Sequence, residues 1–286
     1  MGRVRVGDIV SLLDACYPPS LAQDWDRVGL AVGDPAATVT RVLFVVDCVP
    51  ETVAEAVAGG ADLIVAHHPL LLRGVSSVAT TTYKGRVVHD LITHGIALYV
   101  AHTNADCAPF GVAAALANTI GLQDVRGLVP MPTDAIDGLV AAGRIGRLPM
   151  PMTLAAFAGY VAAALPMTAA GVRAAGAPDL LVTVVAVCPG AGDAFLADAA
   201  KAGVDAFLTA DLRHHPASEH LANGGPALVE ASHWATERGW LDDVARIVAD
   251  GTGVETIISD RVTDPWTVHT SGTGSVGADD VGFTQT

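Results

Sequence analysis

Short apolar runs alternate with helix-like segments along the first hundred residues, and this alternation limits the possible folds more than any other feature. The runs 41–47, 61–66 and 96–101 are short and largely aliphatic, as buried strands are. The segments 51–58 and 85–95 have apolar residues at helical spacing. Strands separated by helices usually pair in parallel and carry helices on both faces. We therefore predict a three-layer α/β/α unit.

A second α/β unit is predicted from the same alternation further along the chain. We expect helices over 154–165 and 191–202 and strands over 180–187 and 206–209. The stretch 127–151, which is richer in Gly and Pro, is interpreted as the boundary between the two units. The strand 227–231 and the helix 235–249 are expected to return the chain to the first unit.

These boundaries give the predicted domain organisation. Residues 1–127 and 228–270 form the first unit, and residues 128–227 form the second. The last sixteen residues, 271–286, are rich in Gly, Ser, Thr and Asp and have few large apolar groups. We predict that they form a disordered tail.

Composition narrows the class of protein. The hydrophobic fraction is 51%, yet no run of roughly eighteen uncharged apolar residues could cross a membrane. The first fourteen residues form an amphipathic helical pattern without signal-peptide features, so we expect a cytoplasmic protein. A net charge of −14 repels a phosphate backbone and argues against nucleic-acid binding. Arg173, Arg213 and Arg238 are available to hold a small anionic ligand.

Four histidines directly follow predicted strands: His67 and His68, His102, and His233. Ligands of such sheets collect beyond the carboxyl ends of the strands, so these side chains are expected to converge. One histidine at a strand end is more often structural, but three strand ends with this feature favour a metal site. The side chains of His67 and His68 diverge on an extended strand end and could serve two ions. The alternative is a turn that caps the strand.

Two carboxylates follow these histidines at a spacing of four residues, Asp106 after His102 and Glu237 after His233. On a helical turn this spacing places both side chains on one face. Glu237 could then bridge two ions. We favour Asp106 as a ligand and His102 as its supporting partner or a proton relay. Asp106 could instead cap the following helix, and 233–237 could be an ordinary helix start.

The proposed ligand set is three imidazoles and two carboxylates, without a thiolate: His67, His68, Asp106, His233 and Glu237. It suits two divalent ions per subunit, with zinc, manganese, iron, cobalt or nickel preferred over calcium. Two such ions activate water and polarise a carbonyl, a ring carbon or a phosphoryl oxygen, so we predict hydrolysis. His102 and His215 are candidate proton-transfer groups, and a polar loop is the alternative for His215.

Three motifs resemble those of the GTP cyclohydrolase 1 type 2 homologues, the NIF3-like family. They are His67-His68-Pro69-Leu70, the segment from His102 to Asp106, and the segment from Ser232 to Arg238. The likeness extends over residues 4–270 and includes 25–30, 143–146 and 188–192. Two departures fall in loops, where Ser232 and Ala210 replace the family's usual glycines.

The resemblance implies a dinuclear site of two consecutive His, an Asp, a further His and a bridging Glu. These positions match His67, His68, Asp106, His233 and Glu237. The resemblance also implies two similar, intertwined three-layer α/β/α domains with mostly parallel or mixed sheets. It implies a ring-shaped homohexamer in which the metal sites face an inner cavity.

Two functional hypotheses remain open from the sequence. The first is a metal-dependent hydrolase of a small molecule, with opening of the guanine ring of GTP as the family name suggests. The chain has no P-loop pattern, so a nucleotide would be held by arginines and by the metals. The second is a non-catalytic metal-binding ring scaffold or metal-delivery protein. A nucleic-acid clamp threaded by the ring is opposed by the acidic charge.

Overall fold

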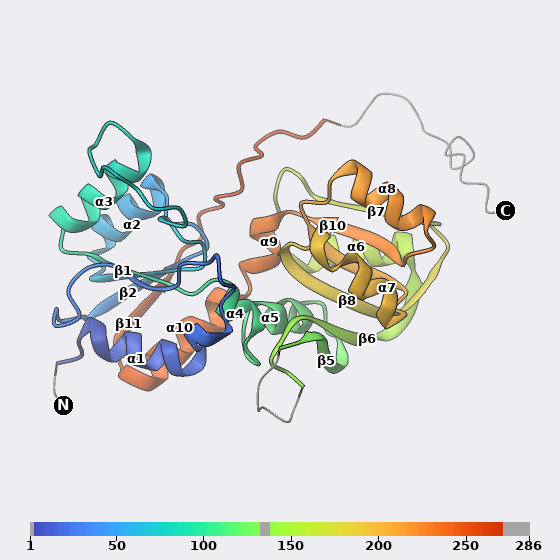
Figure 1. Ribbon diagram of the computed structural model, residues 1–286, viewed down its shortest axis with the longest axis horizontal. Helices are drawn as coiled ribbons and strands as arrows, with labels where there is room; N and C mark the ends of the chain where they lie inside the picture. Colours follow the sequence, from blue (N-terminus) through green and yellow to red (C-terminus); the bar gives the residue numbers. More distant parts are fainter. Residues whose placement is uncertain (1–2, 132–137, 271–286) are drawn as a thin grey trace.

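The computed structural model describes residues 3–131 and 138–270, which form two sheets flanked by helices (Figure 1). The first sheet has the order β1 (Gly29–Val32), β4 (Ala97–Val100), β3 (Leu63–Ala66), β2 (Arg41–Val45) and β11 (Glu255–Ile258). Strands β4, β3, β2 and β11 are parallel, and β1 is an antiparallel edge strand. The helices of this half are α1 (Val6–Cys16), α2 (Pro50–Gly59), α3 (Tyr83–Thr93) and α10 (Trp240–Thr252).

Successive residues of the central strands face opposite layers of helices. In β2, Leu43 and Val45 belong to the apolar cluster that contains residues of α2 and α3. The alternate residues Val42 and Phe44 belong to the cluster that contains residues of α1 and α10. This period of two is the side-chain alternation of a strand buried on both faces. The first half is thus a three-layer α/β/α sandwich, as predicted.

The second sheet is mixed. Its order is β5 (Gln123–Pro130), β6 (Ala141–Thr153), β8 (Leu181–Ala191), β9 (Ala206–Ala210), β10 (Ala227–Ala231) and β7 (Val172–Ala175). Strands β8, β9 and β10 are parallel, and the remaining pairings are antiparallel. Its helices are α5 (Val112–Thr119), α6 (Leu154–Ala164), α7 (Leu196–Ala202) and α8 (His214–Ala222). Residues of α5 and α6 share an apolar cluster with one face, and residues of α7 and α8 with the other.

The described part of the stretch 127–151, which was expected to be a boundary between the two units, forms strands of the second sheet. It contains the end of β5 and most of β6, which pair with each other. Pro149 and Pro151 fall where the register between β6 and β8 shifts, between Arg147 and Met152. A proline is tolerated at such an irregularity because no ladder hydrogen bond is required of its nitrogen.

The residues that form each sheet also differ from the predicted domain ranges. Strand β5 begins at Gln123, before the expected limit at 127, and pairs only within the second sheet. Strand β10 was expected to belong to the first unit, but it pairs with β9 and β7 of the second sheet. The domain ranges themselves remain a prediction. The tail predicted for 271–286 lies outside the described residues.

Three helices lie between the two halves: α4 (Thr103–Cys107), α5 and α9 (His233–Glu237) (Figure 1). After β11 the chain runs without regular structure over residues 259–270, from the first half toward the second (Figure 1). Short 3₁₀ turns occur at Pro19–Leu21 and Asp193–Phe195. In the ranges that the structure describes, the helices are too short or too polar to cross a lipid bilayer.

Candidate metal centre

The candidate ligands lie at the ends of strands from both sheets. His67 and His68 directly follow β3, and their backbone N–H groups still donate to the carbonyls of Val45 and Val46. Asp106 lies in α4, which follows β4 of the same sheet. His233 and Glu237 are the first and last residues of α9, which follows β10 of the other sheet. The site therefore forms where the carboxyl ends of parallel strands from the two sheets face each other.

The five side chains lie close together. His67 Nε2 is 3.4 Å from Glu237 Oε1 and 3.7 Å from Asp106 Oδ1. His68 Nε2 is 3.1 Å from Glu237 Oε2 and 3.2 Å from His233 Nε2. His233 Nε2 is 3.1 Å from Glu237 Oε1. Both oxygens of the Glu237 carboxylate thus face imidazole nitrogens, which places this carboxylate in the middle of the cluster.

Each imidazole of the cluster is oriented through its other ring nitrogen. The Nδ1 partners are the Ala101 carbonyl for His67 (2.9 Å), Asp47 for His68 (2.7 Å), Asp211 for His233 (2.7 Å) and Asp26 for His102 (2.9 Å). An Nδ1–H group that donates to such an acceptor leaves Nε2 as a lone-pair donor. This arrangement of acceptors behind imidazoles is typical of protein metal sites.

The charges of the cluster are strongly coupled. Burial acts to raise the pKa of Glu237, but the surrounding imidazoles of His68, His67 and His233 hold that pKa well below its usual range. Burial acts to lower the pKa of His233, yet Glu237 and Asp211 raise it to about 10. Burial raises the pKa of the Asp106 carboxyl to about 7. The carboxylates of this site thus require nearby positive charge, which a divalent cation would supply.

Three ligand atoms of the cluster have no hydrogen-bond partner in the described structure. They are His67 Nε2, Asp106 Oδ1 and Glu237 Oε2, and all three are buried. Buried polar atoms in proteins nearly always have a partner, so these atoms fit a cation that would bind them together. Imidazole and carboxylate donors without a thiolate suit zinc and its neighbours among the transition metals.

Two groups of possible ligands each have donor atoms within 4.8 Å of one another. One comprises His68, His233 and Glu237, and the other comprises His67, His68 and His102. The predicted supporting residue His102 therefore lies at the cluster, as its ring distances of 5.2 Å to His67 and 5.6 Å to His68 also show. His102 occupies the N-cap position of α4 without a capping side-chain hydrogen bond. The alternative in which Asp106 caps the next helix is wrong because Gly111 occupies that position.

His215 does not lie with the other predicted residues. It is exposed in the first turn of α8 and packs against His214, with ring centroids 5.1 Å apart. In the described ranges no hydrogen bond or ion pair connects His215 to the cluster. Its role as a proton-transfer group therefore has no geometric support. The alternative, a polar loop, is correct in that the position is exposed, but His215 lies in a helix.

The three arginines expected to be available for an anionic ligand are each paired with a carboxylate, so that expectation was wrong. The pairs are Arg173 with Glu230, Arg213 with Asp193 and Arg238 with Asp242. Glu230 lies opposite Arg173 on the neighbouring strand, and Asp193 begins a 3₁₀ turn. Asp242 lies four residues after Arg238, and only this pair could be recognised from its spacing in the sequence.

A glycine allows strand β8 to approach the cluster. Gly190 has a φ of +64°, and a Cβ atom there would lie 2.5 Å from Glu237 Oε1 and 3.1 Å from His233 Nε2. Its N–H donates to the hydroxyl of Thr236 at 2.9 Å, which connects β8 to α9. Any larger residue would therefore be strained in its backbone and would displace the Glu237 carboxylate.

Buried Arg144 of β6 connects the second sheet to the segment after α4. Its guanidinium donates to the carbonyl of Ala108 at 2.6 Å and to those of Ala141 and Gly143 at 2.8 and 2.9 Å. Ala108 follows α4 directly, so this contact holds the helix that carries Asp106 against the second sheet. The position of Asp106 therefore depends on both halves.

The segment 259–266 supports the cluster from two sides. The hydroxyl of Thr263 donates to Asp47, the carboxylate that orients His68. The next residue, Asp264, accepts a hydrogen bond from the hydroxyl of Ser232, the residue that caps α9. Two adjacent residues thus hold both the support of His68 and the start of the helix that bears His233 and Glu237.

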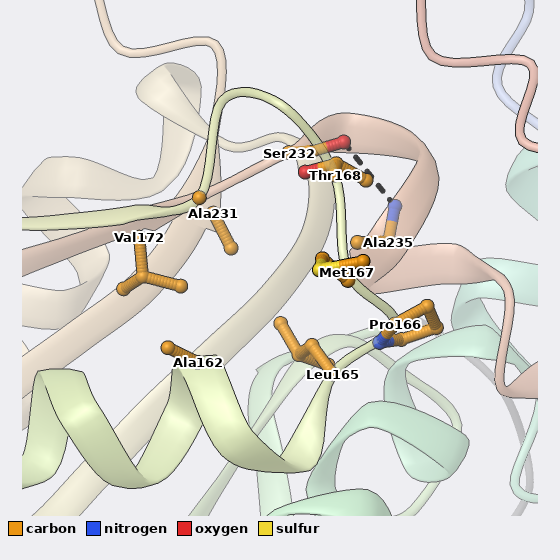
Figure 2. Close-up of a pocket in the computed structure, with 10 residues that line it drawn as sticks. Ala162, Leu165, Pro166, Met167, Thr168, Val172, Ala231, Ser232 and Ala235 are labelled. Atoms are coloured by element: carbon orange, nitrogen blue, oxygen red, sulfur yellow. Dashed lines mark hydrogen bonds between the residues drawn. The ribbon is translucent and has the colours of Figure 1, made fainter. Parts of the chain in front are cut away.

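An apolar pocket lies behind the start of α9 and is distinct from the metal cluster (Figure 2). Leu165, Pro166 and Met167 contribute to it, and none of the five candidate ligands lines it. Figure 2 also shows Ser232, whose hydroxyl accepts from the N–H of Ala235 at 3.5 Å. The cap thus starts α9 with His233 directed toward the cluster and not into this pocket.

Three carboxylates of the site were not identified as such from the sequence: Asp26, Asp47 and Asp211. Asp47 and Asp211 lie shortly after the ends of β2 and β9, and Asp26 precedes β1. An aspartate just beyond the end of a buried strand is the signal that could have identified two of them. The backbone of Asp211 is also unusual, with a positive φ of 55°, which could not be predicted from the sequence.

Together, the fold and the site define a two-sheet α/β protein with a candidate metal centre between its halves. A model of the family described as Duf34/NIF3 (NGG1p interacting factor 3) matches residues 4–265. The chain belongs to this family, which confirms the resemblance of its motifs.

Similar proteins with curated names include a Streptomyces coelicolor protein that is 50% identical over 93% of this chain and 94% of its own length. A Mycobacterium tuberculosis protein is 36% identical over 94% of this chain and 98% of its own length. Both are called GTP cyclohydrolase 1 type 2 homolog.

The fold is also found in solved structures. A Bacillus cereus protein related to NIF3 has a TM-score of 0.87 at 24% identity, covering 94% of this chain and 100% of its own. A Staphylococcus aureus hypothetical protein has a TM-score of 0.86 at 27% identity with the same coverage. The two-sheet α/β architecture is therefore that of the NIF3 proteins.

Proposed function

We propose that the chain is a divalent-metal-dependent hydrolase of a nucleotide or a related small molecule. The observation that carries the proposal is the convergence of His67 Nε2, Asp106 Oδ1 and Glu237 Oε2, three buried atoms without hydrogen-bond partners. The positions of these residues after strands, read from the sequence, favour the same ligands. Two independent arguments thus lead to one set of ligands.

Two ions that share Glu237 would account for the grouping of the side chains. His68, His233 and Glu237 would hold one ion, in keeping with their mutual distances. His67 and Asp106 would hold the other together with Glu237, whose two oxygens face different histidines. Zinc, manganese, iron, cobalt and nickel all suit these donors.

Divalent ions bound here would lower the pKa of water and polarise a substrate carbonyl, ring carbon or phosphoryl oxygen. The protein contributes fixed ligands whose Nδ1 partners keep each imidazole in one orientation. His102 adds a proton-transfer group at the cluster, since Asp26 holds its Nδ1 and leaves Nε2 free to exchange a proton. Burial of His67 and Glu237 keeps bulk water away from the ligands.

The substrate class rests on the names of the similar proteins. They are called GTP cyclohydrolase 1 type 2 homologues, so a purine nucleotide is the first compound to test.

The expected ring-shaped homohexamer and cytoplasmic location are part of the same proposal. Sedimentation of the purified chain should then give six times its 29.1 kDa mass.

The test combines metal analysis with turnover. Wild type loaded with manganese or zinc should hold up to two ions per chain and hydrolyse GTP or a member of a panel of phosphoesters and cyclic amides. Glu237→Ala should lose both properties, because the shared carboxylate is gone. Glu219→Gln on the exposed face of α8 is the matched carboxylate control and should change neither.

Each result separates the possible functions. Turnover that survives in Glu237→Ala would exclude the proposed mechanism. Two bound ions without turnover on any compound would favour the alternative of a non-catalytic metal-binding scaffold or metal-delivery protein. Absence of metal from the loaded wild type would exclude both.

A further inference from the structure

An exposed tryptophan lies at the edge of the metal cluster. Trp25 is 56% exposed, and its ring centroid is 6.0 Å from that of His102 at an interplanar angle of 77°. The His102 ring is in turn 5.2 Å from His67 and 5.6 Å from His68. One imidazole thus separates the indole from the candidate ligands. Leaving a large apolar ring in water beside a polar site is unfavourable unless a ligand covers it.

The backbone on both sides of Trp25 is fixed. Asp26 is buried and accepts hydrogen bonds from His102 Nδ1 at 2.9 Å, from the N–H of Thr103 at 3.0 Å and from the Thr103 hydroxyl. The N–H of Gln23 donates to the same hydroxyl at 3.0 Å. The loop is therefore anchored to the start of α4, so little further ordering is required when a ligand contacts the indole.

We propose that Trp25 is the stacking platform for the planar ring of the substrate, and that the substrate is a nitrogen heterocycle such as a purine. This inference rests on the proposed function and specifies its substrate class. Stacking on an aromatic side chain accepts any flat base and typically contributes tenfold or more to affinity. A ring placed on Trp25 lies beside His102, whose Nε2 can exchange protons with ring nitrogens.

A cation on the same loop suits a ring that carries an anionic group. The Arg27 guanidinium donates to the backbone carbonyls of Asp24, at 3.5 Å, and Asp26, at 2.5 Å. Over residues 3–131 and 138–270 no carboxylate pairs with it, in contrast to Arg173, Arg213 and Arg238. Its charge is therefore available to a phosphate.

The experiment measures equilibrium binding to the metal-loaded full chain by titration calorimetry. The probes are GTP, guanosine and ribose 5-phosphate, which lacks the base. The variants are Trp25→Ala and Trp25→Phe, with Trp266→Ala as the control for another exposed tryptophan. Metal content is measured for every variant.

Trp25→Ala should weaken GTP and guanosine binding tenfold or more, leave ribose 5-phosphate unchanged and retain its metal. Trp25→Phe should keep most of the affinity, and Trp266→Ala all of it. Quenching of indole fluorescence by guanosine should disappear in Trp25→Ala and in Trp25→Phe, which both lack this indole, and should persist in Trp266→Ala. Equal guanosine affinity in wild type and Trp25→Ala would overturn the proposal, and so would a wild type that binds no base, or a change of assembly state in Trp25→Ala.

The stacking of a base on Trp25 and the proposed hydrolase activity can be tested independently. A protein that binds guanosine through Trp25 but hydrolyses nothing would keep this inference and lose the proposed hydrolase. A protein that hydrolyses a compound without a planar ring, with unchanged kinetics in Trp25→Ala, would keep the hydrolase and lose this inference.

Discussion

Two carboxylates, each bonded to the Nδ1 atom of a candidate ligand, determine how the imidazole rings are oriented. Asp47 and Asp211 hold His68 and His233 at 2.7 Å each, and neither lies in the candidate ligand set. The hydrogen bond from His233 lowers the pKa of Asp211, so this carboxylate is charged when it supports the ring. A charged acceptor raises the basicity of the imidazole and fixes its tautomer.

We predict that Asp211→Asn lowers metal affinity 10- to 100-fold, as loss of such partners typically does. An asparagine side chain has no negative charge, and it can present its N–H group to His233 Nδ1, which itself carries hydrogen. Metal affinity measured by competition with a chelator tests this. Asp250→Asn, on an exposed position of α10, is the control and should leave affinity unchanged. Equal affinities for the two variants would contradict the prediction.

The candidate ligands could be predicted from the sequence more readily than the carboxylates that orient them. His67, His68, His233 and Glu237 stand in short motifs beside strand ends, so local spacing indicates a shared site. The supporting carboxylates are distant in sequence from the residues they orient, since His68 and Asp47 follow different strands and are 21 residues apart. Such a pair forms only through the parallel pairing of β2 and β3, which no local pattern specifies.

At the scale of elements, the close approach of β8 to α9 depends on Gly190. We predict that Gly190→Ala abolishes tight metal binding, because the new methyl group would meet the Glu237 carboxylate. The matched control is Gly203→Ala, which has nearly the same φ, +66°, at the end of α7 but open space around its Cβ position. Both variants should lose about 1 kcal/mol of stability from the left-handed backbone.

Only Gly190→Ala should change metal content, measured by elemental analysis of variants purified in parallel. Thermal unfolding of the two apoproteins provides the check on stability. If Gly203→Ala loses metal to the same extent, the effect comes from general strain and not from the contact with Glu237.

Elements with a regular apolar pattern were predicted well, and irregular ones were not. Helix α2 and strands β2, β3 and β4 fall within two residues of the expected ranges because their apolar patterns are regular. Strand β6 was missed because its glycines and prolines resemble a loop, although neighbouring strands force it into the sheet. Strand β11 has four residues and is defined by its partner β2 more than by its own sequence.

At the scale of the whole molecule, two buried tyrosines make stability depend on alkaline pH. Tyr17 and Tyr99 are fully buried between helix α1, helix α10 and the first sheet. The Tyr99 hydroxyl donates to Asp14 at 2.7 Å, and Tyr17 accepts from Trp240 Nε1 at 3.1 Å. Burial raises the pKa of both phenols well above 10.

In the unfolded chain these phenols lose their protons at about pH 10, whereas the folded chain retains them. The stabilisation is thus complete below about pH 10 and declines as pH rises further. We predict that the unfolding free energy falls by up to about 1.4 kcal/mol per pH unit for each tyrosine in this range. Urea unfolding of wild type between about pH 8 and pH 11 measures the slope.

The double variant Tyr17→Phe with Tyr99→Phe should have a shallower slope, and Tyr83→Phe, at a half-exposed position, should have that of wild type. A wild-type free energy that stays constant above pH 10 would contradict the prediction. A shallower slope in Tyr83→Phe would show that the effect is not specific to the buried phenols.

The pairing of β2 with β11 has a consequence for translation. The second sheet comes from one continuous stretch, 123–231, and can close soon after it leaves the ribosome. The first sheet waits for its last strand, since Arg41 of β2 pairs with Glu255 of β11, 214 residues later. During most of synthesis the nascent chain therefore exposes an unpaired edge of β2, where chaperones would be expected to bind.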